Sequence, residues 1–113
     1  MEHILKLNPK YFEYMKNGTK IIEVRLNDEK RRNIRVGDLI IFKKEPDLVE
    51  EIHTIVENLI YQDSFQKLVD EIETSLYSDV TETKEKYLED IFHFYTKEEE
   101  QKYGVVGIKI KKV

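Results

Sequence analysis

Alternating apolar residues at both ends of the chain, with helical patterns between them, constrain the fold more than any other feature. Residues 20–26 and 105–112 each place apolar and charged side chains on opposite faces, as a half-buried strand does. The apolar sets are Ile22, Val24 and Leu26 in the first segment and Val106, Ile108 and Ile110 in the second. Short strands at the two ends with helices between them predict an α+β protein, a small β-barrel with helices packed over it.

Capping and turn residues divide the rest of the chain into short elements. Asn8-Pro9 opens a helix that Asn17-Gly18 closes, because Asn caps a helix, Pro suits its first position and Gly its end. Thr96 and Glu99 form a capping box for a short helix that ends at Gly104. Other strands are expected over 2–7, 39–43 and 51–61, and other helices over about 64–74 and 82–94. The inward residues of these two helices should be Phe65, Leu68, Val69 and Ile72, and Leu88, Ile91, Phe92 and Tyr95.

Length and composition exclude several classes of protein. A chain of 113 residues fits one domain, so we expect a single domain over 1–113 with a helical insert at about 64–102. There are no cysteines, which rules out disulfides, thiolate metal sites and a Cys nucleophile. The three histidines are far apart and no Gly-rich phosphate loop is present, so we expect neither a metal nor a cofactor. No signal-peptide pattern and no membrane-spanning run is visible, which favours a cytoplasmic protein without a membrane partner; we favour a monomer.

Charge is distributed unevenly along the chain. The net charge is −4, but residues 1–44 hold 11 Lys/Arg against 6 Asp/Glu, a net of +5. Residues 45–101 hold 4 against 17, a net of −13, and residues 102–113 hold 4 against none. We therefore predict that the two basic ends share one sheet, while the acidic helices at about 64–94 cover another side. A local basic patch of this kind matters more for phosphate binding than the total charge does.

The segment from Gly18 to Arg25 is the densest cluster of functional side chains. Glu23 and Arg25 project from the same strand face, where an acid and a base can hold a nucleobase edge, a phosphate or a substrate. The pattern alone favours an ordinary solvent-facing ion pair, because exposed strand faces are routinely charged. Lys20 lies three residues before Glu23, so the two meet only if Lys20 belongs to the irregular turn after Gly18.

Three motifs resemble the ASCH domain family. Gly18-x-Lys20-x-x-Glu23-x-Arg25 is followed by Val36-Gly37-Asp38-Leu39-Ile40-Ile41-Phe42, and residues 100–108 are similar to the closing strand of small prokaryotic ASCH proteins. The resemblance spans nearly the whole chain and is weakest at about 45–95. It implies a PUA-like β-barrel whose cleft, between barrel and helices, holds the Gly-x-Lys-x-x-Glu-x-Arg segment. It also implies RNA or nucleotide-like ligands.

One branch of the family implies a possible activity. Its members are 4-acetylcytidine amidohydrolases, which use a Lys matching Lys20, a Thr at the position of Glu23 and a Glu further along. Here Glu23 replaces the Thr and so removes its hydroxyl. If the protein is an enzyme, Lys20 and Glu23 are the catalytic candidates, because a Lys with a lowered pKa beside a carboxylate can transfer protons.

We interpret the chain as an RNA- or nucleotide-binding domain that uses Lys20, Glu23, Arg25 and the basic loop over residues 30–35. A basic run of Lys30, Arg31, Arg32 and Arg35 is expected either to contact phosphates beside the cleft or to form a solvated loop. Tyr11, Tyr61 and Tyr103 can stack on a base if they line the cleft, although we favour buried packing for them. The alternatives are a hydrolase acting on a modified nucleoside or on RNA, and a protein-interaction module that uses the acidic helical insert.

Overall fold

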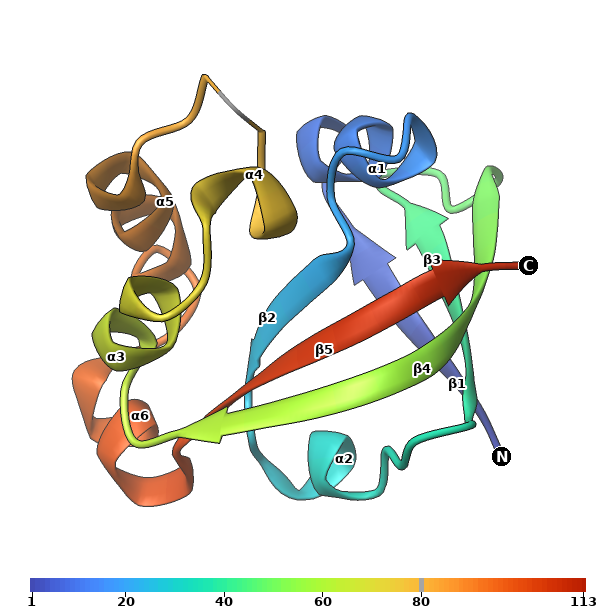
Figure 1. Ribbon diagram of the computed structural model, residues 1–113. Helices are drawn as coiled ribbons and strands as arrows, with labels where there is room; N and C mark the ends of the chain where they lie inside the picture. The colour runs from blue at the N-terminus through green and yellow to red at the C-terminus, as the bar shows by residue number, and fades with distance from the viewer. Residues whose placement is uncertain (80) are drawn as a thin grey trace.

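Five strands form one mixed sheet in the order β1-β3-β4-β5-β2 (Figure 1). They are β1 (Glu2–Leu7), β2 (Ile22–Leu26), β3 (Leu39–Lys44), β4 (Glu51–Gln62) and β5 (Val105–Lys112). β1 runs parallel to β3, and all other neighbours are antiparallel. This computed structural model describes residues 1–79 and 81–113.

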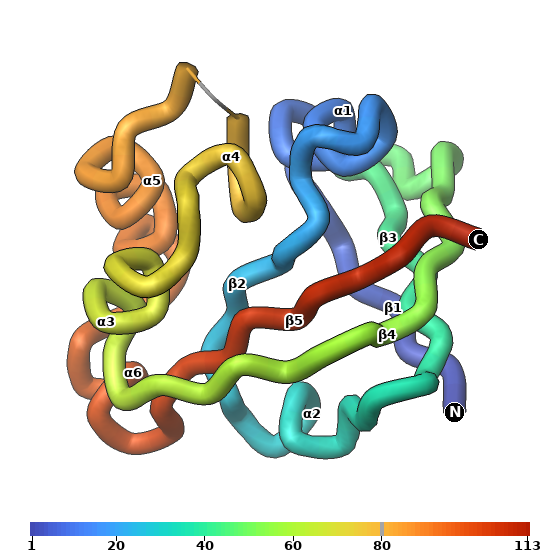
Figure 2. The backbone as a smooth tube through the Cα atoms, viewed as in Figure 1, coloured from blue at the N-terminus to red at the C-terminus, as the bar shows by residue number. Residues whose placement is uncertain are grey.

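Short helices cover the sheet on one side and at one end. They are α1 (Pro9–Lys16), α2 (Glu29–Arg32), α3 (Phe65–Asp70), α4 (Thr74–Tyr77), α5 (Lys84–Ile91) and α6 (Lys97–Tyr103). The tube in Figure 2 shows α3 to α6 gathered beside β2, away from β1 and β3. No helix among the described residues is long and apolar enough to cross a membrane.

The sheet curls because β4 is long and bends. A register shift between Val56 and Asn58 interrupts its pairing with β5, and such bulges bend a strand and increase its twist. Before the bulge the strand alternates as expected, with Ile52 and Thr54 buried and Ile55 exposed. The inside of the curl is filled by one apolar cluster, which comprises Leu5, Leu7, Phe12, Met15, Ile34, Ile40, Phe42, Ile52, Val56, Val106, Ile108 and Ile110.

A second apolar cluster joins β2 to the helical layer. It comprises Ile22, Val24, Leu26, Phe65, Leu68, Val69, Ile72, Tyr77, Tyr87, Ile91 and Val105. β2 is therefore packed on both faces, since its alternate residues Glu23 and Arg25 are also buried or half-buried. This strand lies between the barrel and the helices.

The curled sheet stays open between its two edge strands, β1 and β2, which do not pair with each other. One side chain bridges this seam: Nη2 of Arg25 in β2 donates a hydrogen bond of 2.6 Å to the backbone oxygen of Lys6 in β1. An edge strand otherwise presents unpaired backbone groups. The seam is therefore where the backbone and polar side chains of both edges are available to a ligand.

The structure confirms the expected fold, an α+β β-barrel with helices over it. It also confirms that the two basic ends share a sheet, because β2 pairs with β5 along its whole length. All four inward residues expected for the helix after residue 64 are buried. Residue 80, inside the expected helical insert at about 64–102, lies outside the described residues.

Several element bounds differ from the prediction. The helix expected over 64–74 ends at Asp70, after which the chain turns so that α4 lies against β2; the backbone nitrogen of Ile21 donates to the oxygen of Leu76 at 2.8 Å. The helix expected over 82–94 spans only residues 84–91, and its most buried residue is Tyr87, which was not among the expected inward residues.

Candidate functional site

A cleft of about 350 Å³ occupies the open seam of the sheet. It lies between the end of β1, the central residues of β2, the first helix and the helix α5 with the turn that follows it. The lining residues are Lys6, Leu7, Asn8, Tyr11, Glu23, Val24, Arg25, Glu45, Tyr87, Asp90, Ile91, Phe94 and Tyr95. Segments far apart in the sequence thus build one concave site, as is usual for binding sites for small molecules.

Lys20, Glu23 and Arg25 form a continuous chain of charges at the wall of this cleft. The ammonium of Lys20 lies 3.0 Å from Oε1 of Glu23, and Nε of Arg25 lies 2.6 Å from Oε2 of the same carboxylate. Lys20 reaches Glu23 because it precedes β2, which begins only at Ile22, in an irregular stretch after Gly18. Gly18 permits that turn with a φ of +91°. Lys20 and Glu23 therefore meet in the way that the sequence required, with Lys20 in the irregular turn after Gly18.

The Lys20 ammonium is enclosed, and all of its donors are used. Besides Glu23 it donates to the backbone oxygens of Ile22 at 2.7 Å and Tyr77 at 2.6 Å, which accounts for its three protons. Its side chain has 0% of its surface exposed, against 6% for Glu23 and 13% for Arg25. Lys20 thus sits beneath Glu23, and Glu23 and Arg25 are the members of the set that line the cleft.

Burial and pairing both act on these charges. Burial lowers the pKa of Lys20 below its ordinary value, against the opposing attraction of the Glu23 carboxylate. Burial acts to raise the pKa of Glu23, but the two adjacent cations outweigh it and hold that pKa below its ordinary range. Glu23 is therefore an ionised carboxylate inside the protein. The interpretation of Glu23 and Arg25 as an ordinary solvent-facing pair is wrong. These two residues pair with Ile108 and Val106 of β5, whose side chains belong to the inner apolar cluster, so their face of β2 turns into the curl of the sheet.

Tyrosines form two further walls of the cleft. The rings of Tyr11 and Tyr87 meet edge to face, with centroids 5.6 Å apart and planes at 83°. The Tyr11 hydroxyl donates to Oδ2 of Asp90 at 3.0 Å. Burial, and for Tyr11 also the bond to Asp90, raises the pKa of both phenols well above its ordinary value, so both are neutral. Phe94, with 71% of its surface exposed, lies at the lip of the cleft.

Tyr87, Asp90 and Phe94 line the cleft but were not among the candidates expected from the sequence. A signal was available for the first two: residues 87 and 90 are three apart and share a face of α5 with Ile91. The expected inward set was Leu88, Ile91, Phe92 and Tyr95. Of these Ile91 is buried and Tyr95 also lines the cleft, whereas Leu88 is only partly buried and does not line it. Which face of a short helix turns toward the barrel depends on what it packs against, and that partner was unknown from the sequence.

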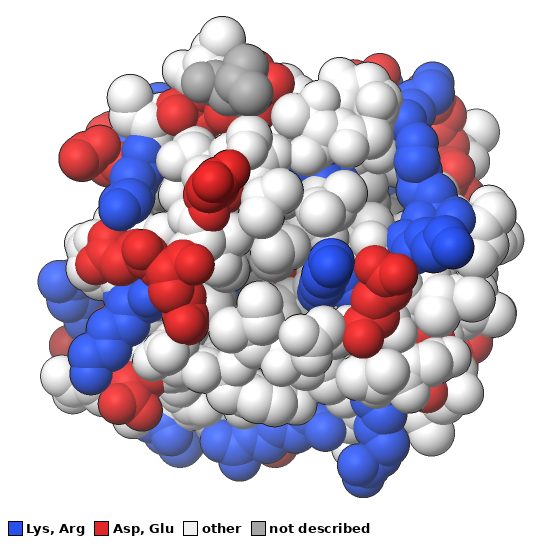
Figure 3. Space-filling model, viewed as in Figure 1, with Lys and Arg blue, Asp and Glu red and all other residues white. Residues whose placement is uncertain are grey.

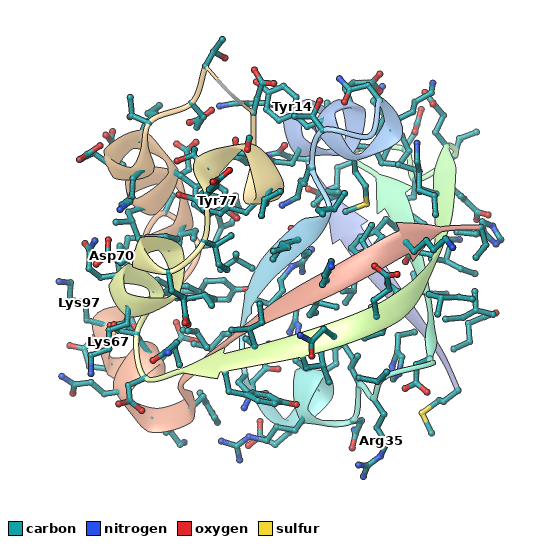
Figure 4. All side chains as sticks on the ribbon, viewed as in Figure 1. Tyr14, Arg35, Lys67, Asp70, Tyr77 and Lys97 are labelled. Atoms are coloured by element: carbon teal, nitrogen blue, oxygen red, sulfur yellow. The ribbon has the colours of Figure 1, made fainter. Side chains whose placement is uncertain are left out.

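The basic run after β2 lies apart from the cleft, and none of its residues lines it. Figure 4 places Arg35 beyond α2 at the lower edge, far from Tyr77, whose oxygen binds Lys20. Arg31 pairs with Asp28 at 3.0 Å and is mostly covered, with 15% of its side chain exposed. Lys30, Arg32 and Arg35 are exposed.

Of the three tyrosines considered for stacking, only Tyr11 lines the cleft. Tyr61 and Tyr103 line a separate hollow, and Tyr61 has 55% of its surface exposed, so buried packing does not describe it. Within residues 1–79 and 81–113, no group of three or more His, Asp and Glu side chains is arranged to hold a metal ion.

A curled sheet with helices beside one edge strand and a cleft at its open seam defines a PUA-like barrel. The profile of the ASCH domain matches residues 5–113, and the chain belongs to the ASCH domain family. ASCH domains are PUA-like and are generally considered to bind RNA.

Two solved structures are similar over the whole chain. The hypothetical protein PH0355 is 34% identical, with a TM-score of 0.87 and complete coverage of both chains. Protein PF0455 from Pyrococcus furiosus is 32% identical, with a TM-score of 0.76, and the match covers 100% of this chain and 98% of that one. No match was found among the curated proteins.

Proposed function

We propose that the protein binds RNA or a nucleotide by taking one unpaired nucleobase into the cleft at the seam. The observation that carries the proposal is a buried, ionised Glu23–Arg25 pair facing an aromatic-walled cleft of about 350 Å³. A flat ring suits walls made of Tyr11, Tyr87 and Phe94, since unpaired bases stack on aromatic side chains. Glu23 and Arg25 then read the edge of the base.

The polar groups of the cleft match a base edge better than a phosphate. Its lining contains the carboxylates of Glu23, Glu45 and Asp90 but only two cations, Lys6 and Arg25. A carboxylate accepts hydrogen bonds from an exocyclic amine or a ring N–H, whereas it repels a phosphate. Nη1 of Arg25 has no hydrogen-bond partner among the described residues, and a guanidinium donates to base oxygens and nitrogens in a fixed plane. The cleft thus offers both hydrogen-bond donors and acceptors, which favours a base edge over a phosphate as the ligand.

Lys20 supports this function by positioning Glu23. Two buried backbone oxygens and one carboxylate oxygen surround its ammonium, so it holds Glu23 in place and compensates the buried negative charge. Side chains of a binding site that are held by such contacts lose little freedom when a ligand binds.

The test is calorimetric titration of the four nucleoside monophosphates into wild type and variants. Arg25→Ala should weaken the best binder by about tenfold or more, because a charge-assisted hydrogen bond contributes roughly 1.5–3 kcal/mol. Since Arg25 also bridges the seam, Phe94→Ala serves as a second variant: it is exposed at the lip and should weaken binding about fivefold by loss of stacking, with the fold intact. Arg35→Ala, outside the cleft, is the matched control. Unchanged affinity in both Phe94→Ala and a folded Arg25→Ala would refute the proposal.

A nucleoside amidohydrolase is the second candidate, and the lowered pKa of Lys20 beside Glu23 is the observation in its favour. Proton transfer to a substrate also requires that the ammonium reach it, and here the side chain is enclosed and its protons are shared among three acceptors. Glu23 offers no hydroxyl. We expect no fast deacetylation of 4-acetylcytidine, measured as product formation by liquid chromatography. Robust turnover that Glu23→Gln abolishes would make the hydrolase the better proposal.

A further inference from the structure

We infer that a second nucleic-acid contact lies outside the cleft, in a hollow at the end of β4, where a base of single-stranded RNA stacks on Tyr61 and its backbone phosphates meet Arg32 and Lys102. The inference extends the proposed function, because it concerns how a longer strand is held once one base occupies the cleft. The hollow measures about 560 Å³ and is lined by Asn27, Tyr61, Gln62, Asp63, Gln101, Lys102, Tyr103, Gly104 and Val105.

Tyr61 offers an aromatic surface without a structural task of its own. It lies in β4 opposite Val106, whose side chain belongs to the inner core, but it is 55% exposed at the mouth of the curl. A tyrosine contributes to core packing only when its ring is covered. None of the contacts between aromatic rings among the described residues involves Tyr61. An exposed ring in a hollow is a stacking platform that accepts any base.

Cations surround the neighbouring ring of Tyr103. The Lys102 ammonium lies 5.0 Å and the Arg32 guanidinium 5.8 Å from its centroid. Arg32 is also anchored, since its Nε donates to the oxygen of Asn27 at 2.8 Å and its Nη2 to the oxygen of Tyr103 at 3.4 Å. Its guanidinium is therefore held at the edge of the hollow before any ligand arrives.

These cations differ from most others in the protein because no carboxylate neutralises them. Lys10, Lys16, Lys43, Lys44 and Lys84 all pair with acidic side chains. By contrast Arg32 and Lys102, together with Lys30 and Arg35 of the same edge, have no ion-pair partner in the part of the chain that the structure describes. Figure 3 shows Lys and Arg side chains in a row along the lower edge of the molecule, over α2. Unpaired cations beside an exposed aromatic ring are the features that proteins use to bind single strands.

The hollow and the cleft lie at neighbouring positions of the chain, at β2 and just past its end. Arg25 lines the cleft, and Asn27 lines the hollow two residues later, about 7 Å further along an extended chain. Oδ1 of Asn27 is buried and has no hydrogen-bond partner among the described residues, which leaves one acceptor at this junction. The short interval lets one strand of RNA reach both places. The carboxylate-rich cleft takes a base, and the unpaired cations take the phosphates that the cleft does not accommodate.

The test compares a twelve-nucleotide oligouridine with uridine monophosphate as ligands of the same full-length variants. Tyr61→Ala should weaken oligouridine binding at least about fivefold, with Tyr61→Phe restoring it, while leaving the mononucleotide affinity unchanged. Arg32→Ala and Lys102→Ala should each reduce the slope of log affinity against log salt concentration by about 0.7, the value for one phosphate contact on a single strand. Lys111→Ala is the control, because Lys111 is an exposed cation at the opposite end of β5 and has no ion-pair partner within residues 1–79 and 81–113.

The outcomes separate this inference from the proposed function. Oligouridine binding that is unchanged in Tyr61→Ala and Arg32→Ala, or that falls equally for both ligands, overturns the second contact. Failure of the wild type to bind oligouridine more tightly than the mononucleotide also overturns it and leaves the cleft untouched. If instead Phe94→Ala and Arg25→Ala have no effect on either ligand while Tyr61→Ala weakens the oligouridine, the cleft proposal fails and the second contact stands.

Discussion

At the scale of single residues, the point at which β2 begins decides whether the Lys20 ammonium can reach Glu23. Had β2 begun two residues earlier, Lys20 and Glu23 would point to opposite faces of the strand. Because the strand begins at Ile22, the ammonium folds back under Glu23 and joins β2 to α4 through the oxygen of Tyr77. Lys20, which the sequence suggested as a ligand contact, is thus part of the protein interior.

We predict that Lys20→Met destabilises the protein by roughly 3–5 kcal/mol, the range found when one partner of a buried ion pair is removed. The change leaves Glu23 with a single cationic neighbour and leaves the oxygens of Ile22 and Tyr77 without their donor. Urea unfolding followed by circular dichroism measures the effect. The matched control is Lys111→Met, which is exposed and should stay within about 0.5 kcal/mol of wild type. A loss below 1 kcal/mol for Lys20→Met would show that the buried charges are not mutually dependent.

At the scale of elements, residues close to the junction between α6 and β5 are almost sufficient to predict it. Thr96 and Glu99 make the reciprocal bonds of a capping box, and α6 ends at Gly104 as expected. Gly104 has a φ of +71° and a ψ of −173°, a region that essentially only glycine occupies. The helix therefore stops where β5 must start, and the strand enters the sheet in register with both β4 and β2.

We predict that Gly104→Ala destabilises the protein by about 1–3 kcal/mol, the range for a residue forced into a sparsely populated backbone conformation. A Cβ here would also lie only 3.1 Å from the backbone oxygen of Gln62, which adds a steric cost. Gly18→Ala is the comparison, because Gly18 also has a positive φ but open space around its Cβ position. Thermal unfolding should rank Gly104→Ala as the more damaging change, and the reverse order would contradict the role given to Gln62.

At the scale of the whole molecule, the long-range pairing of the sheet gathers the basic ends of the chain. Asp38 helps to fix the first of these ends, since it contacts the amino terminus at 3.3 Å and His3 at 2.8 Å. It also accepts the backbone N–H of Arg35. One carboxylate thus ties β1 to the turn that leads into β3, and these two strands form the parallel pair at the sheet edge.

This carboxylate should make the stability depend on pH in acid. The hydrogen bond to His3, followed by that from Arg35, lowers the pKa of Asp38 to about 2. A carboxyl whose pKa is lower in the folded state contributes stability above its unfolded pKa of about 3.9, and that contribution is lost as the pH falls through the folded pKa. Asp38→Asn should therefore be less stable than wild type at pH 5, and the difference should shrink between about pH 4 and pH 2.

Chemical denaturation at a series of pH values measures this difference, and NMR titration of the Asp38 carboxyl gives its pKa directly. Asp63→Asn is the control, because the Asp63 side chain is 91% exposed and its one ion pair among the described residues is with Lys67, at 3.5 Å. A stability difference between Asp38→Asn and wild type that stays constant from pH 5 to pH 2 would rule out the linkage.

Local patterns in the sequence are enough to locate the elements that depend on neighbouring residues. Alternation located the strands, and capping residues located the ends of α1 and α6, since both signals act over a few neighbouring residues. The sequence also marked Gly18 to Arg25 as the segment with the densest cluster of functional side chains. Tertiary structure alone decided which face of each element is covered. It turned Glu23 into the curl of the sheet, brought Tyr87 and Asp90 rather than Leu88 to the cleft, and separated the basic run of α2 from that cleft. The physical reason is that burial is a property of contacts between distant segments, and the free energy of each contact depends on a partner that no local pattern contains.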